Sequence, residues 1–354
     1  MRSAADDVVA VARRWWRPWY RAVLVGLIVA ICAAIHIEMP GKYPDFTVFW
    51  AAATHFGGPV YDSAFLTPLQ HGPPGDRPFA YPPTFLLLIL PLGLLPMQVA
   101  YVAWVTASAI ALVEVGARLT RFSWFALTSP IAMFAGLIGQ TIFIVGALVA
   151  GAFAIEGSIA AGILLGVAAS IKPQVAILIP VVLLLEKRWT VLLAMGGTGL
   201  LLCAAATVVF GPPVWVDWLA QLPRFMQIND RLNIPRLGLP LPFNLLAAMA
   251  SVGLMALATA EGDRPKALVA ALAGGLLLSP HSPAYDATVV FVPAIAAVGL
   301  GWRLVPLVLL LFGEAWLFNE TWLAPATFAI ATGAIALPRL STLRGGQRAP
   351  AVTR

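Results

Sequence analysis

Charged residues are scarce in this 354-residue sequence: they make up 11% of it, whereas an ordinary soluble domain carries about 25%. Apolar residues make up 60%, and the mean hydropathy is +0.88. A water-soluble protein of this size could not hide so much apolar surface in its core, and a disordered chain needs the opposite composition. The lipid bilayer must therefore be the solvent for most of the chain.

Cysteine is nearly absent as well. Cys32 and Cys203 both lie in apolar runs, which excludes a disulfide framework and a C-x-x-C motif. The sequence also lacks a GxGxxG, P-loop, HExxH or GxSxG motif in a usable context. Because no acidic cluster has metal-ligand spacing, we expect no metal ion. We expect no cofactor either.

The net charge of +6 does not indicate a nucleic-acid partner, because the basic residues gather at the two ends of the chain. Residues 1–19 are basic and aromatic, and residues 339–354 form a basic tail. If both ends are cytoplasmic, sixteen of the 22 lysines and arginines lie inside and five outside, the bias that sets membrane orientation. We expect membrane lipids, and no nucleic acid, as partners.

The apolar runs predict an all-α, polytopic membrane protein with about twelve transmembrane helices in one domain, residues 1–354. Segments 40–83 and 211–240 are expected to be outer loops. Segment 84–95 is closed by prolines and too short to cross, so it is interpreted as a re-entrant or interfacial helix. The predicted spans are 20–39, 97–118, 122–138, 140–155, 158–171, 174–185, 190–210, 241–260, 266–278, 285–300, 303–318 and 321–338.

Asp45 follows the first predicted span directly, within GKYPDFTVFW. A carboxylate among aromatic residues at a membrane face is poorly hydrated, which shifts its pKa and suits it to proton transfer. The alternative is structural: Asp45 could cap a helix over residues 46–53, since aspartate is a favoured N-cap residue.

Two polar residues stand at the ends of apolar runs. Lys172 precedes a proline in AASIKPQ and has no charged neighbour in its segment; a lysine at membrane depth is costly, which makes it a site candidate. Gln140, in LIGQTIF, is a candidate for substrate contact. The alternatives are a lysine that snorkels to the interface and an amide that bonds neighbouring helices.

Two further segments place polar groups on the predicted outer side. Arginine side chains suit a phosphate group, although charged loops often serve only solvation. A histidine, a tyrosine and an aspartate share the short turn SPHSPAYD. The candidates from these segments are Arg224, Arg231, Asn244, His281, Tyr285 and Asp286.

Taken together and in order, these motifs resemble glycosyltransferase family 87, polytopic enzymes of the GT-C class that include polyprenol-phosphate-mannose-dependent mannosyltransferases. The resemblance runs from about residue 43 to 290. The residues that carry it are Asp45, Phe46, Phe49, Trp50, Tyr61, Asp62, Tyr81, Pro82, Pro83, Gly139, Gln140, Lys172, Pro173, Ser279, Pro280, His281, Tyr285 and Asp286.

The resemblance implies an inverting transfer of a sugar, a hexose such as mannose, from a polyprenyl phosphate to a glycolipid or glycan acceptor. The site would face outward from a bacterial cytoplasmic (inner) membrane, and short juxtamembrane helices would form the first outer loop. Asp45 would be the general base. Lys172, His281, Arg224 or Arg231 would bind the leaving phosphate, and Tyr61, Tyr81, Gln140, Asn244, Tyr285 and Asp286 would bind substrate. The alternative is a lipid or lipid-linked-sugar flippase, although no internal repeat supports it.

Overall fold

The structure is a computed structural model that describes residues 44–70, 77–155, 157–228, 241–279, 281–298, 303–312 and 323–337. Within these ranges every regular element is helical, which confirms the all-α prediction. The α-helices are α2 (Pro44–Thr54), α3 (Ser63–Leu66), α4 (Pro83–Ile89), α5 (Met97–Gly116), α6 (Pro130–Leu137), α7 (Ile142–Ala154), α8 (Ile159–Ile171), α9 (Ile179–Leu185), α10 (Trp189–Phe210), α11 (Pro213–Ile228), α12 (Leu241–Ala260), α13 (Arg264–Leu278), α14 (Thr288–Ala297), α15 (Leu304–Phe312) and α16 (Leu323–Ala336). The 3-10 helices are η1 (Thr67–Gln70), η2 (Leu90–Leu94), η3 (Ser123–Thr128), η4 (Pro173–Ala176) and η6 (Ala284–Ala287).

Only a few of the described helices are long enough to cross a bilayer. Helices α5 and α10 are, by length and apolar composition, and the pair α6–α7 adds a third if it counts as one span bent by 118°. Helix α12 also has 20 residues, of which Leu245–Ala260 form a shorter apolar helix within the described part. The other predicted spans are shorter or divided helices where the structure describes them, and the segment 20–39 and both termini lie outside the described residues. The count of twelve spans therefore stays a prediction.

Prolines divide the apolar runs into separate helices. Pro83, Pro130 and Pro173 each stand at the start of a helix, where the missing N–H costs nothing and the fixed φ suits the first turn. Lys172, which precedes a proline, has φ −133° and ψ 86°, because a residue before proline is disfavoured in the α conformation. Helix α8 therefore ends at Ile171, and the chain turns at the lysine.

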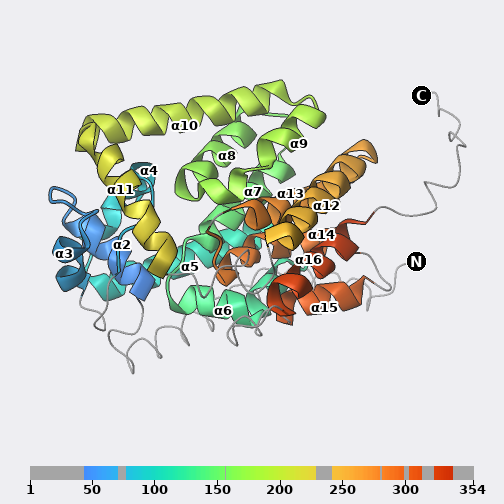
Figure 1. The fold of residues 1–354 in the computed structure, drawn as a ribbon, viewed down its shortest axis with the longest axis horizontal. Helices are drawn as coiled ribbons and strands as arrows, with labels where there is room; N and C mark the ends of the chain where they lie inside the picture. Colours follow the sequence, from blue (N-terminus) through green and yellow to red (C-terminus); the bar gives the residue numbers. More distant parts are fainter. Residues whose placement is uncertain are drawn as a thin grey trace, which may run out of the picture.

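Helix α13 lies in the middle of the packed helices and contacts α12, α14 and α16. Its residues from Lys266 to Leu277 are all buried. Helix α10 packs on α8 and α4 along one edge of the molecule, and α11 turns back from its end toward α4 and α2 (Figure 1). Segment 211–240, expected only as a loop, thus contains a helix of 16 residues.

The segment between α2 and α5 consists of short helices packed side by side. Helix α2 contacts η1, η2, α4 and α5, and the Trp50 indole N–H donates to the Leu95 carbonyl oxygen at 2.9 Å. Segment 84–95 forms the seven-residue α4 followed by η2, too short to cross as a straight helix. This arrangement brings the start of α2 and the chain before α4 next to the turn between α6 and α7.

Candidate active site

A cavity of about 470 Å³ lies where the short helices of residues 44–94 meet the ends of the longer ones. Its wall is mostly apolar and aromatic, with a few polar groups that converge on it, the usual make-up of a small-molecule site. The residues that line it are Asp45, Val48, Phe49, Pro78, Ala80, Tyr81, Pro82, Gln140, Ile171, Lys172, Pro173, Gln174, Ile177, Trp218, Leu222, Phe225, Ser279, His281, Pro283 and Tyr285.

Asp45 lies in the first turn of α2, because this helix begins at Pro44 and not at residue 46 as the capping alternative assumed. Its Oδ2 accepts a short hydrogen bond from Gln140 Nε2. Next to it, the backbone N–H of Phe46 donates to the Ile138 carbonyl oxygen at 3.0 Å, which ties α2 to the α6–α7 turn. Burial raises the pKa of Asp45 above its usual range, against the opposing effects of the Gln140 bond and of the charges of Lys172 and Arg77.

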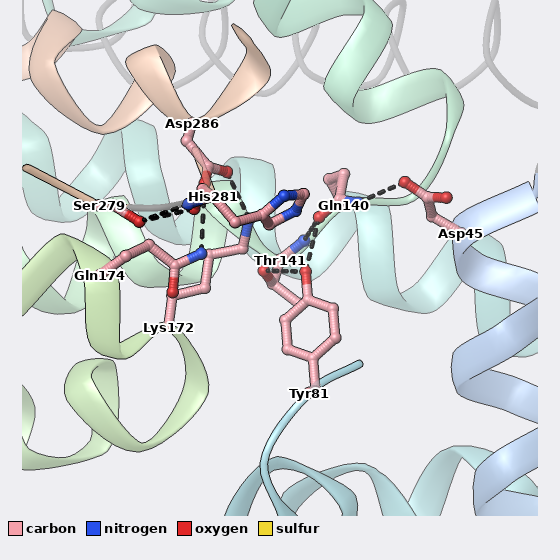
Figure 2. A network of polar contacts seen from close by, with 9 residues as sticks. All are labelled: Asp45, Tyr81, Gln140, Thr141, Lys172, Gln174, Ser279, His281 and Asp286. Carbon is pink, nitrogen blue, oxygen red and sulfur yellow. Dashed lines mark hydrogen bonds and ion pairs between the residues drawn. The ribbon is translucent and has the colours of Figure 1, made fainter. Parts of the chain in front are cut away.

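Tyr81 stands beside this carboxylate, and Gln140 lies between the two (Figure 2). Its hydroxyl donates to Gln140 Oε1 at 2.8 Å and lies 3.1 Å from the Thr141 hydroxyl. The Tyr61 hydroxyl donates to the Tyr81 carbonyl oxygen at 3.0 Å and so fixes the backbone there. Burial raises the pKa of Tyr81 to about 12, so its phenol is a hydrogen-bond donor at neutral pH.

The sequence context predicted an unpaired Lys172, and this prediction is wrong. Its ammonium donates to Asp286 Oδ1 in a buried ion pair, and Gln174 Nε2 lies 3.5 Å from Asp286 Oδ2. The ammonium also lies 5.0 Å from the ring centre of Tyr285 and 5.7 Å from that of Tyr81, distances at which an aromatic face attracts a cation. The carboxylate balances the buried charge, and Lys172 is one of the residues that line the cavity.

His281 reaches the cavity from the turn after α13. Ser279 Oγ donates to the His281 carbonyl oxygen at 2.7 Å and accepts from its N–H at 3.1 Å, which closes the turn. The imidazole packs edge-on against Phe225 of α11, with ring centres 4.4 Å apart. Nearer its start, helix α11 is anchored by Trp218, whose indole N–H donates to the Ala80 carbonyl oxygen at 3.0 Å.

The structure brings together six of the residues predicted from the sequence: Asp45, Tyr81, Gln140, Lys172, His281 and Tyr285 all line the cavity. Tyr61 and Asp286 do not line it but stand behind Tyr81 and Lys172 as hydrogen-bond partners. Arg224 is exposed on α11 and is not part of the wall. Arg231 and the side chain of Asn244 lie outside the described residues.

The wall residues that were not predicted from the sequence include Gln174, Trp218 and Phe225. Gln174 could have been recognised as a candidate in the sequence, because it directly follows Lys172 and Pro173. Trp218 and Phe225 could have been found by the apolar spacing of segment 213–228, which is typical of an amphipathic helix. Among the described residues, no three His, Cys, Asp or Glu side chains gather as a metal site would require.

A comparison with protein families shows the family of the chain. The model of glycosyltransferase family 87 matches residues 79–283, more than half of the chain. The chain belongs to glycosyltransferase family 87. No curated protein and no solved structure shows a match.

Membership of family 87 makes the protein a glycosyltransferase, which acts on a sugar donor and an acceptor. Its apolar helices and its family together indicate association with a membrane. The matched range includes Tyr81, Gln140, Lys172 and His281, but not Asp45. Asp45 precedes the matched range, and it reaches the cavity because α2 packs against the α6–α7 turn.

Proposed function

We propose that this family 87 protein is an inverting glycosyltransferase of GT-C type with about twelve membrane spans. It moves a sugar, a hexose such as mannose, from a polyprenyl phosphate to a glycolipid or glycan acceptor on the outer face of a bacterial cytoplasmic membrane. The observation that carries this proposal is that one cavity holds a carboxylate and an ammonium, each held in place by a separate set of hydrogen bonds.

In the proposed reaction, Asp45 takes the proton of the acceptor hydroxyl. The hydroxyl oxygen forms a bond to the anomeric carbon from the side opposite the phosphate, which inverts the configuration. The bond between that carbon and the phosphate oxygen breaks, and its electron pair leaves with the polyprenyl phosphate. Proton removal by a positioned side chain is general-base catalysis.

The leaving phosphate gains negative charge as this bond breaks, so a fixed cation beside it lowers the barrier. Lys172 suits that role, because it lines the cavity and its ammonium is held by Asp286. The other oxygen of Asp286 lies 3.5 Å from Gln174 Nε2. His281 is a second group on the same wall that can donate a hydrogen bond to phosphate oxygens. We expect the reaction to need no added metal or cofactor.

Turnover by the purified full-length protein, offered a panel of short-chain polyprenyl-phosphate sugars with lipid-linked and free glycan acceptors, tests the proposal. We expect transfer from one donor, with inverted configuration in the product and release of polyprenyl phosphate. Transport of the lipid-linked sugar across vesicles without any transfer would overturn the proposal in favour of a flippase.

A further inference from the structure

Gln140 uses its side-chain amide to join polar groups from three places. Its Nε2 donates to Asp45 Oδ2, and its Oε1 accepts from the Tyr81 hydroxyl at 2.8 Å (Figure 2). The backbone N–H of Thr141 lies 3.2 Å from the same oxygen. Because a backbone N–H can only donate, this contact fixes which end of the amide is the oxygen. The NH2 end must then face Asp45.

We propose that Gln140 is the positioning residue of the general base, held by Tyr81 and Thr141 so that its N–H points at Asp45. This inference rests on the proposed function of Asp45. The amide oxygen has two lone pairs and both are used, and one of the two N–H groups is used as well. Gln140 is 4% exposed, so little of its amide remains for a sugar. The role differs from the substrate contact expected from the sequence.

The two elements that carry this pair are fixed to each other through their backbones. The backbone N–H of Phe46 joins α2 to the turn through the Ile138 carbonyl oxygen. The turn is also held by α5, because the Trp104 indole N–H donates to the Gly139 carbonyl oxygen at 3.0 Å. Gly139 has a φ of +69°, and a Cβ there would lie 2.6 Å from the Phe46 Cβ, so α2 and the turn are in close contact. The spacing between Gln140 and Asp45 is therefore set by the fold and not by two mobile side chains.

The bond has a chemical consequence for the base. A hydrogen bond to the ionised form of a carboxyl group favours that form, so the Gln140 N–H opposes the effect of burial on Asp45. Because the bond occupies Oδ2, we expect the acceptor's proton to go to Oδ1. The amide thus favours the ionised form of the base and sets which oxygen reacts.

Other groups also act on Asp45, and the test must leave them in place. The cations of Lys172 and Arg77 favour its ionised form, and the carboxylate of Asp286 disfavours it. Among the uncharged groups, Tyr81 lies on the far side of Gln140, and Tyr285 interacts both with the Gln140 amide and with Asp45. All of them remain when Gln140 alone is replaced.

The test measures kcat/KM against pH for the wild-type protein, Gln140→Met and Gln140→Glu. We expect the acid limb of the Gln140→Met profile to move upward by about one to two pH units, with activity partly restored at alkaline pH, because a bond to a charged group has been lost. Gln140→Glu is nearly isosteric and places a second carboxyl group beside Asp45. Two such groups share a proton and one pKa is strongly raised, so its limb should move further.

Gln174→Met is the matched control. It removes a side-chain amide of the same kind from the same cavity, but this amide lies beside Asp286 and not Asp45. It should change the kinetics for the donor and leave the acid limb where it is. A structural loss of cavity shape would lower activity at every pH without moving the limb.

Two outcomes overturn the positioning role. The first is a folded Gln140→Met protein whose acid limb coincides with that of wild type; if Gln140→Met does not fold, the same result with Gln140→Glu decides. The second comes from Asp45→Asn: near-normal turnover in that variant overturns both proposals. Loss of turnover in Asp45→Asn together with an unmoved limb in the Gln140 variants overturns the positioning role alone.

Discussion

Replacing Asp45 by asparagine separates the base from every structural role of this side chain. Asparagine has nearly the same shape, and its amide oxygen can accept the Gln140 N–H that Asp45 Oδ2 now accepts. It cannot take a proton from a hydroxyl group. General-base catalysis typically contributes about 10²–10⁴-fold, which corresponds to about 2.7–5.4 kcal/mol in the barrier. We expect a loss of at least about a hundredfold in turnover.

The stability of the variant should not fall. Burial raises the pKa of Asp45, which means that the folded state holds the proton more tightly than the unfolded state does. An acid with a raised folded-state pKa lowers stability as the pH rises through that range. At neutral pH a neutral asparagine is therefore expected to leave the melting temperature unchanged or slightly higher.

The assay is single-turnover transfer from a lipid-linked sugar by protein of wild-type melting temperature. Asp62→Asn is the control: Asp62 is exposed, lies in the same segment and caps α3 by accepting from the Ala64 N–H at 2.9 Å. Asparagine caps a helix about as well as aspartate does, so this variant should keep full activity. Transfer by Asp45→Asn at nearly the wild-type rate would refute the assignment of the base.

Three further predictions follow from the same structure. Lys172→Met alone strands the buried charge of Asp286, which costs about 3–5 kcal/mol; we expect Lys172→Met with Asp286→Asn to fold and to lose about tenfold or more in kcat/KM for the donor, and unchanged donor kinetics would contradict the role of Lys172. Gly139→Ala should lower stability by about 2–4 kcal/mol, from its left-handed φ and its contact with α2; Gly157→Ala, with a similar φ and open space around it, should cost less in thermal unfolding. Gly57→Cys, in a background without native cysteines, should react with an impermeant reagent added outside intact cells. Labelling only after the cells are permeabilised would show that the orientation is the opposite of the predicted one.

The sequence was sufficient to find most of the polar groups of this cavity, because they stand out against an apolar background. Lys172 and Gln140 interrupt apolar runs, and Asp45 follows one. The helical class follows from the same composition. These signals depend only on neighbouring residues, so a single sequence shows them without an alignment.

The pairing of these groups could not be predicted, since it joins distant parts of the chain. Asp286 lies 114 residues from Lys172, and Gln140 lies 95 residues from Asp45. Which partner each group meets depends on how the helices pack, and the packing depends on where Gly139 and the prolines break them. Lys172 therefore looked unpaired, and Asp286 looked like a residue that contacts substrate.

Residues outside the family match are the hydrogen-bond partners of residues inside it. Within residues 79–283, Gln140 has a donor that points at Asp45 and Lys172 has an ammonium that points at Asp286. A buried polar group without a partner is costly, and a buried charge without one more so. The matched part thus contains two side chains whose partners lie on either side of it. We conclude that the cavity is one unit from Asp45 to Asp286, in which the side chains that hold both carboxylates belong to the family match and the carboxylates themselves do not.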